Sequence, residues 1–146
     1  MDYSALAIEF FDKMHMLRKA KPQKHIDGAL QGEAFALHYI ASHGGEVVPG
    51  EIGNEMNVST ARIAQTLNSI ERKGWITRQI DQTDRRRILV KLTPEGKSVE
   101  DAHYREIIGT TASMLSMLGE ADAVEYIRIM GKLAEIVSRH SDQISF

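Results

Sequence analysis

The fold is decided between residues 59 and 93, which read STARIAQTLNSIERKGWITRQIDQTDRRRILVKLT. Ile63, Leu67 and Ile70 recur at positions i, i+4 and i+7, which is the spacing of one buried helix face. Gly74 then ends this helix, and two runs of alternating apolar and polar residues follow it. The stretch therefore predicts a helix and then a β-hairpin.

The two strand-like runs cover residues 75–80 and 88–93, and the polar tip between them, residues 81–87, reads DQTDRRR. Three adjacent arginines repel one another, so an anionic partner would explain them. The narrow minor groove of DNA attracts inserted arginine in this way. A charged tip that only prevents edge-to-edge aggregation is the alternative. Asp84 is placed to pair with one of the arginines and to orient it.

The outer face of the predicted helix carries Arg62, Gln65, Thr66, Ser69 and Lys73, with no acidic residue among them. Arginine and glutamine can make bidentate contacts to guanine and adenine, and hydroxyl groups can bind phosphates or bases. A polar face that only meets water is the alternative. The pattern favours a helix that is anchored on one side and reads DNA with the other.

Three further helices are predicted upstream, at residues 3–20, at about 30–43, and from Pro49 to Asn57. Proline suits the first turn of a helix because its missing N–H is not needed there, and asparagine suits the left-handed turn that ends one. Residues 21–28 are polar and read as a connection. Two short helices joined by a tight turn and followed by a hairpin form a winged helix-turn-helix.

On the face of the predicted helix at 30–43 lie Leu30, Ala34, Leu37 and Ala41. Downstream, Thr93 and Pro94 mark the start of a long helix that Gly119 ends, and a last helix covers about 121–139. The apolar stripes of these two helices consist of Ile107, Thr111, Met114 and Leu118, and of Val124, Ile127, Met130, Leu133 and Val137. Stripes at both ends of the chain predict a dimer.

Charge is unevenly distributed along the chain. Residues 59–97 hold nine basic and four acidic side chains, a local net charge of +5, while the remainder carries −7 and the whole chain −2. A basic segment in an acidic chain is expected when one face meets polyphosphate. A solvated surface with random clustering of charge is the alternative.

Several function classes are excluded or disfavoured. The chain has no cysteine, which excludes disulfides, thiol sensing and thiolate metal sites. Its six histidines form no metal-binding array, and no catalytic motif occurs, because residues 45–50 (GEVVPG) read as a loop before a helix. We expect no metal, no cofactor and no enzyme activity. No leader or membrane-spanning run is visible, so a cytoplasmic protein without membrane contact is expected.

Four runs together resemble the MarR family of regulators: EIGNEMNVS (51–59), LNSIERKGWITR (67–78), Asp84-Arg85-Arg86 and VKLTPEG (90–96). The resemblance covers almost the whole chain. It implies an obligate homodimer, with the first helix and the last two packed between subunits and two winged lobes on adjacent turns of DNA.

Carried over by position, Arg86 matches the family's minor-groove arginine, and Asp84 matches the acidic residue that holds it. Gly53 departs from the usual alanine of the third helix, and Trp75 departs from the usual leucine or tyrosine. Neither departure affects the DNA-binding assignment.

The predicted fold class is mainly α with a small β-hairpin wing. A single MarR-like domain (1–146) is expected, with a DNA-binding lobe at 30–93 and a helical dimerisation region at 1–20 and 94–146. The predicted function is a sequence-specific transcription regulator, a repressor released by a small ligand, that binds palindromic double-stranded DNA as a homodimer. A nonspecific architectural or protein-interaction module is the alternative.

The predicted DNA-binding residues are Ser59, Thr60, Arg62, Gln65, Thr66, Ser69, Arg72, Lys73, Arg78, Asp84, Arg85, Arg86 and Arg87. By resemblance, the effector is a small aromatic or phenolic compound bound between the dimer helices and the winged lobe. Met14, Met16, Met114 and Met117 are candidates for lining its pocket, although methionines at helical spacing also suit a core.

Overall fold

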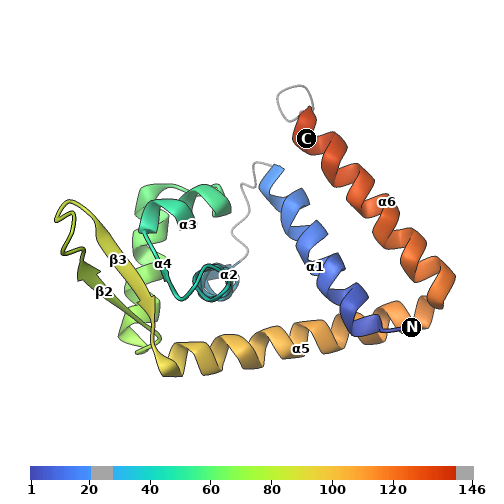
Figure 1. Ribbon diagram of the computed structural model, residues 1–146, viewed down its shortest axis with the longest axis horizontal. Helices are drawn as coiled ribbons and strands as arrows, with labels where there is room; N and C mark the ends of the chain where they lie inside the picture. The colour runs from blue at the N-terminus through green and yellow to red at the C-terminus, as the bar shows by residue number, and fades with distance from the viewer. Residues whose placement is uncertain (21–27, 141–146) are drawn as a thin grey trace. The chain divides into compact units, whose positions relative to one another are not determined.

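The computed structural model describes the backbone of residues 1–20 and 28–140, and the side chains of residues 1–16 and 32–140. Within these ranges it contains six helices and one three-stranded antiparallel sheet (Figure 1). The predicted fold class, mainly α with a small β wing, is confirmed. The predicted connection at residues 21–28 lies, apart from Gly28, outside the described residues.

The chain divides into two compact units, which we name the winged unit (residues 24–104) and the helical unit (residues 1–23 and 105–146). The winged unit contains α2 (Gly28–Ser42), β1 (Glu46–Val47), α3 (Pro49–Met56), α4 (Thr60–Arg72), β2 (Ile76–Ile80), β3 (Ile88–Leu92) and the first turns of α5 (Pro94–Leu118). The predicted helices and wing strands are present, with bounds that differ by one or two residues.

The sheet has the strand order β1-β3-β2, so that β3 is central and the hairpin β2–β3 forms the wing. The wing register runs from Ile76 opposite Leu92 to Ile80 opposite Ile88. Strand β1 was not predicted, because residues 45–50 were interpreted as a loop. Two residues are too few to show alternation, yet Val47 pairs with Val90 and is buried in the core.

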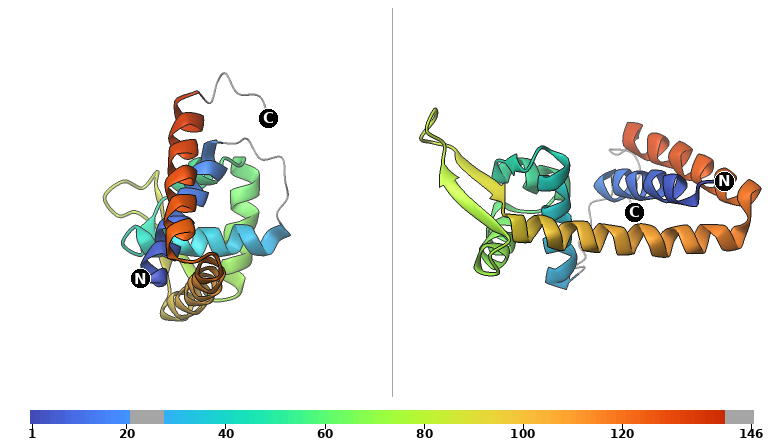
Figure 2. Two further views of the ribbon diagram at one scale, coloured as in Figure 1. Left: turned by 90° about the vertical axis from the view of Figure 1, so that its right-hand side faces the viewer. Right: turned by 60° about the horizontal axis from the view of Figure 1, so that its bottom comes forward.

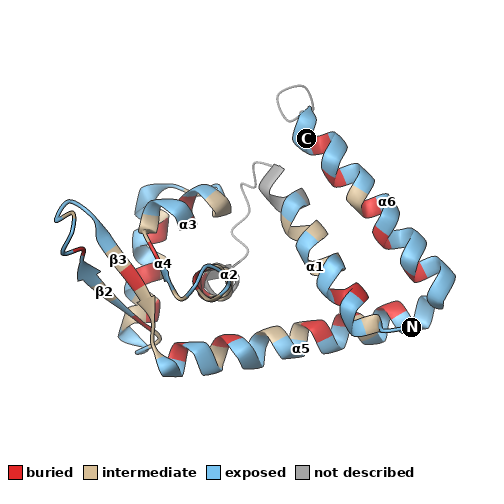
Figure 3. Ribbon diagram, in the orientation of Figure 1, coloured by how far each residue is buried: buried red, intermediate tan, exposed pale blue. Residues whose placement is uncertain are grey.

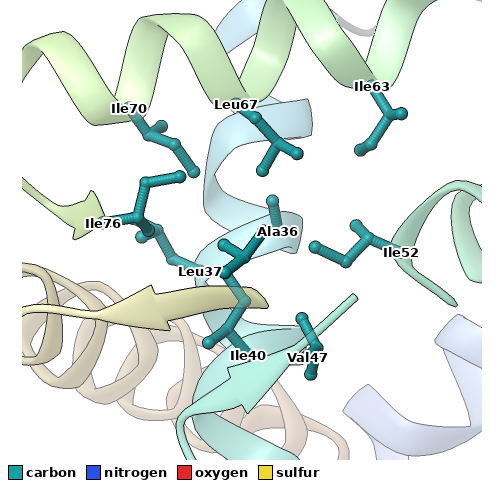
Figure 4. Packing of buried hydrophobic residues seen from close by; sticks show 10 residues of the cluster. Ala36, Leu37, Ile40, Val47, Ile52, Ile63, Leu67, Ile70 and Ile76 are labelled. Carbon is teal, nitrogen blue, oxygen red and sulfur yellow. The ribbon is translucent and has the colours of Figure 1, made fainter. Parts of the chain in front are cut away.

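A single cluster of buried side chains forms the core of the winged unit (Figure 4). Its members are Ala36, Leu37, Ile40, Val47, Ile52, Ile63, Leu67, Ile70, Ile76 and Val90. The three apolar residues of α4 are buried there, as predicted. The buried face of α2 differs from the prediction: it carries Ala36 and Ile40 beside Leu37, whereas Ala34 and Ala41 are only half-buried.

The helical unit contains α1 (Tyr3–Ala20), the remainder of α5, and α6 (Glu120–Arg139). Asp2 caps α1, because its Oδ1 accepts hydrogen bonds from the N–H groups of Ser4 (3.0 Å) and Ala5 (3.2 Å). α1 and α6 lie side by side (Figure 1), and the ring centroids of Phe10 and Tyr126 are 5.9 Å apart. No helix among the described residues is both long and apolar enough to cross a bilayer.

The apolar residues of α5 and α6 are only partly buried in the helical unit (Figure 3). Of the predicted stripe of α6, Ile127, Met130 and Val137 are buried, but Val124 and Leu133 are exposed. On α5 the buried residues of this unit are Ile108, Thr111 and Leu115. The exposed apolar side chains of these two helices are Met114, Met117, Leu118, Val124, Tyr126, Ile129, Leu133 and Ile136.

Candidate nucleic-acid interface

A tight turn joins α3 to α4 in the winged unit. Pro49 begins α3, and Asn57 ends it in the left-handed conformation at φ 55° and ψ 46°. Ser59 then caps α4 by accepting a hydrogen bond of 3.2 Å from the N–H of Arg62. The roles of Pro49 and Asn57 were predicted, and Ser59 is the cap although Thr60 also suited that position. Together they form a helix-turn-helix in which α4 is the second helix, the one that enters the major groove in such motifs.

α4 has one buried face and one outward face. Ile63, Leu67 and Ile70 are at most 3% exposed, and they fix the helix against α2 and α3. On the other side, Gln65 is exposed and Arg62 is half-buried. The face that the sequence assigned to DNA is therefore held on a rigid support, with hydrogen-bonding side chains at its first two turns.

The hydroxyl groups at the start of α4 differ in their partners. Ser59 is occupied with the helix cap, and Thr66 donates a 3.2 Å hydrogen bond to the carbonyl of Arg62. Thr60 is exposed. Each of these oxygens keeps a lone pair that can accept a further hydrogen bond.

The last turn of α4 is held from inside the winged unit by Glu33 of α2, a residue that sequence reasoning missed. Glu33 is 4% exposed, and it accepts hydrogen bonds from the Ser69 hydroxyl and, at 2.7 Å, from the Lys73 ammonium. Two of the predicted DNA-binding side chains thus already have a partner. Arg72, between them, is exposed.

The charge state of Glu33 follows from these contacts. Burial raises the pKa of Glu33, but the hydrogen bonds from Lys73 and Ser69 and the charges of Lys73 and Arg72 outweigh it, so that the pKa is lowered overall. The carboxylate is therefore ionised at neutral pH. A signal was present in the sequence, since Glu33, Leu37 and Ile40 recur at i, i+4 and i+7 on the buried face.

The wing extends from the winged unit as a two-stranded hairpin (Figure 2). Asp81 shapes its tip by accepting hydrogen bonds from the Thr83 hydroxyl (2.7 Å) and N–H (2.9 Å), which lower the pKa of Asp81. The tip closes through backbone hydrogen bonds from Asp81 N–H to the Arg87 carbonyl (3.0 Å) and from Arg87 N–H to the Asp84 carbonyl (2.9 Å). The tip is thus an ordered turn.

The three arginines of the tip are all exposed. Asp84 accepts hydrogen bonds from the backbone N–H (3.1 Å) and the Nε (3.2 Å) of Arg86, which is the pairing that the sequence predicts. The Arg86 side chain is nevertheless 91% exposed. Asp84 therefore orients this guanidinium without covering it.

Arg78 is the middle residue of β2. Its Nη2 donates hydrogen bonds to Asn68 Oδ1 (2.6 Å) and Glu71 Oε1 (2.7 Å), both on α4, and the hydrogen bond from Arg78 lowers the pKa of Glu71. Arg78 is thus engaged with the recognition helix itself. Its predicted contact with DNA stays a prediction, as do the DNA contacts of the other predicted site residues.

The four methionines proposed for a ligand pocket lie in the helical unit. Met14 is half-buried, and Met16, Met114 and Met117 are exposed. A groove between α1 and α6 is lined by other residues, many of them charged, such as Glu9, Lys13 and Arg128. No three His, Asp or Glu side chains converge on a metal-binding position in the described ranges 1–20 and 28–140.

Comparison with known proteins identifies the family. The sequence model of the MarR family matches residues 29–87. The transcriptional repressor MdtR of Bacillus subtilis is 30% identical over 120 residues, which cover 80% of this chain and 74% of that protein. The chain belongs to the MarR family. As a MarR family protein, it is a winged-helix, DNA-binding transcription regulator, and such regulators are generally not enzymes.

Two other known proteins match over different lengths. The multiple antibiotic resistance protein MarR of Salmonella typhimurium is 36% identical over 62 residues, which cover 42% of this chain and only 43% of that protein. The crystal structure of FabT of Streptococcus pneumoniae in complex with DNA has a TM-score of 0.64, with 23% identity and 94% of each chain covered. At that identity the likeness shows the fold.

Proposed function

We propose that this MarR family protein is a repressor that binds palindromic DNA as a homodimer, with α4 in the major groove and the wing in the minor groove. The observation that carries the proposal is the arrangement of the winged unit. In this unit, α4 buries one face in the core and presents the other face outward, and the ordered tip of the wing presents exposed arginines. FabT, which has this fold, was solved on DNA.

The proposed contacts divide by chemistry. Arg62 and Gln65, on the first two turns of α4, are suited to bidentate contacts with base edges. Gln65 is exposed and Arg62 is half-buried. Arg86 is suited to the minor groove, where narrow A·T-rich stretches concentrate negative potential. The remaining proposed phosphate or base contacts are Ser59, Thr60, Thr66, Arg72, Arg85 and Arg87. Asp84 and Arg78 act by orienting the wing.

A homodimer is supported by the exposed apolar side chains of α5 and α6. Leu118, Ile129 and Leu133 are between 48% and 51% exposed in the single chain. Large apolar side chains gathered on one part of a surface favour association. A dimer would also present two α4 helices to successive major grooves, roughly 34 Å apart, which is the geometry a palindrome requires.

We also propose that a small aromatic or phenolic compound releases the DNA, with Met14, Met16, Met114 and Met117 as candidate pocket residues. Methionine side chains are flexible and polarisable and adapt to aromatic ligands. Such a ligand must bind the free and the DNA-bound conformations with different affinity in order to act.

The test is fluorescence anisotropy of the purified protein against DNA from upstream of its own gene and a shuffled duplex, across a salt series. A specific regulator should prefer its operator by about 10³-fold or more, and binding should weaken as salt rises. Equal weak binding to both duplexes would favour a nonspecific architectural role or an operator elsewhere. No binding to either at moderate salt would favour a protein-interaction module.

A further inference from the structure

The carboxylate of Glu33 is fully occupied by the recognition helix. One oxygen accepts the hydrogen bond from Ser69, and the other lies 2.7 Å from Lys73 Nζ. Lys73 Nζ also lies 4.9 Å from the ring centroid of Trp75, which gives the ammonium a second, cation–π contact. The ammonium of Lys73 is therefore held by two groups of the winged unit, Glu33 and Trp75.

This arrangement restricts what Lys73 can bind. The Lys73 side chain is 39% exposed, but the Glu33 side chain is only 6% exposed. Moving the ammonium to a DNA phosphate would leave a buried carboxylate without its counter-charge, which is strongly unfavourable. Lys73 is a basic residue on a DNA-binding helix whose charge is already neutralised.

We propose that Glu33 withholds Lys73 and Ser69 from DNA, so that neither of these two side chains adds a phosphate contact and nonspecific affinity stays low. The inference rests on the proposed function, in which α4 is the recognition helix. It makes Glu33 a positioning residue that acts on specificity through Lys73. Phosphate contacts supply essentially all of nonspecific binding, whereas the base contacts at the start of α4 would be unaffected.

The lowered pKa of Glu33 agrees with this role, because the carboxylate stays charged and keeps the lysine paired throughout the neutral pH range. Arg72, on the same turn, is exposed and contributes to the field that favours ionised Glu33. The last turn of α4 thus contains one restrained cation and one exposed cation.

The test is a double-mutant cycle on a duplex of shuffled sequence, with the wild type, Glu33→Gln, Lys73→Met and the double variant compared by anisotropy across salt. Glu33→Gln should bind the duplex more tightly than the wild type. Its plot of log affinity against log salt should be steeper by about 0.9 for each lysine released, which means that each lysine adds roughly a further threefold loss of affinity between 50 and 200 mM salt. In the wild-type background, Lys73→Met should leave the DNA affinity and the salt slope unchanged, although it should lower stability because the buried Glu33 carboxylate loses its counter-charge. In the Glu33→Gln background it should cancel the gain in affinity.

Glu46→Gln is the matched control for the loss of one negative charge. Glu46 pairs with Lys91 at 3.6 Å, and both side chains are 43% exposed, so Lys91 is not restrained by a buried carboxylate. This variant should leave the salt slope close to that of the wild type. If Glu33→Gln and Glu46→Gln gain equal affinity for the shuffled duplex, the change in net charge alone explains the effect, and the proposal is wrong.

Lys73→Met alone keeps the proposal testable if Glu33→Gln does not fold, and circular dichroism checks the fold of both variants. A loss of affinity and of about one unit of slope in this single variant would mean that Lys73 already binds phosphate, and the inference fails. Failure of the proposed function looks different, because the wild type itself would then bind no duplex, or would bind the shuffled duplex as well as any other. If the wild type binds its operator selectively but the double-mutant cycle shows no coupling between positions 33 and 73, the inference is wrong and the proposed function still holds.

Discussion

The guanidinium of Arg78 lies 2.7 Å from the carboxylate of Glu71, and this contact joins the wing strand β2 to the recognition helix α4. A second hydrogen bond from Arg78 to Asn68, at 2.6 Å, anchors the same guanidinium one turn earlier on α4. The two parts of the proposed DNA interface are thereby fixed to each other by side chains as well as by the chain connection. The orientation of the wing depends on this pair.

Replacing Glu71 with alanine should therefore lower the affinity for DNA clearly, while the free energy of unfolding changes little. Both side chains of the pair are between 29% and 38% exposed, so solvent screens the interaction, and the loss of unfolding free energy should be at most about 1 kcal/mol. Urea unfolding and anisotropy measure the two effects. Glu125→Ala breaks an exposed pair with Arg128 on α6 and should leave DNA affinity unchanged. If Glu71→Ala and Glu125→Ala bind DNA with equal affinity, the pair of Arg78 and Glu71 does not influence DNA binding, and the prediction is wrong.

The stability of the protein should depend on pH through Glu33. Its pKa is lowered in the folded state from the usual 4.5, so the stabilisation is complete above about pH 4.5 and is lost as pH falls through the folded value. Urea unfolding of the wild type and of Glu33→Gln should show a difference in unfolding free energy that is constant at neutral pH and shrinks in acid. A difference that does not change with pH would contradict the paired carboxylate.

Two glycines of the winged unit should respond in opposite directions to alanine. A Cβ at Gly53 would meet Ile63 Cγ2 at 3.8 Å, an ordinary contact, so Gly53→Ala should stabilise α3 by about 0.5–1 kcal/mol. A Cβ at Gly96 would lie 2.0 Å from the Trp75 carbonyl oxygen, so Gly96→Ala should cost about 1–3 kcal/mol. Thermal unfolding should show a higher midpoint for the first variant and a lower one for the second.

Arg86→Ala should weaken DNA binding without unfolding the protein. The side chain is 91% exposed and pairs with Asp84 of the same tip, so its loss removes the proposed contact with DNA and leaves the core intact. We expect the salt slope to fall by about one for each wing that contacts DNA. Arg139→Ala, an exposed arginine of the helical unit, is the matched control and should bind as the wild type does. Unchanged affinity in folded Arg86→Ala would remove the wing from the interface.

The free protein should sediment as a dimer at micromolar concentration. Burial of exposed apolar residues such as Ile129 and Leu133 between two copies provides the driving force. Replacing both with glutamate should shift the equilibrium toward the monomer, while Glu135→Lys on the same helix should not. A stable wild-type monomer would contradict the proposed dimer.

The helix-turn-helix and the wing were predictable because their signals are local. Asn57, Ser59 and Gly74 mark the ends of α3 and α4, and each acts through its own backbone conformation or a hydrogen bond within three residues. The pair of Asp84 and Arg86 is local in the same sense. Such features need no knowledge of the rest of the fold.

The features that were missed depend on distant partners. Strand β1 exists because Val47 pairs with Val90, 43 positions along the chain, and its two residues carry no pattern of their own. Glu33 was missed for a related reason, because a glutamate in an apolar helix reads as a surface residue until Ser69 and Lys73 are placed beside it. Trp75 was assigned to the strand, but its N–H donates to the Ile70 carbonyl at 3.0 Å and completes the end of α4.

The one-sided burial of α4 has a consequence for how such regulators diversify. Ile63, Leu67 and Ile70 carry the packing, while Arg62 and Gln65 carry none of the buried contacts of the core. Outward positions can therefore be replaced at little cost to the fold, since surface substitutions usually change stability by no more than about 0.5 kcal/mol. Under the proposed function, a few substitutions in these two turns of helix would change the operator that a duplicated copy recognises. The same independence makes α4 a natural place to engineer altered operator preference.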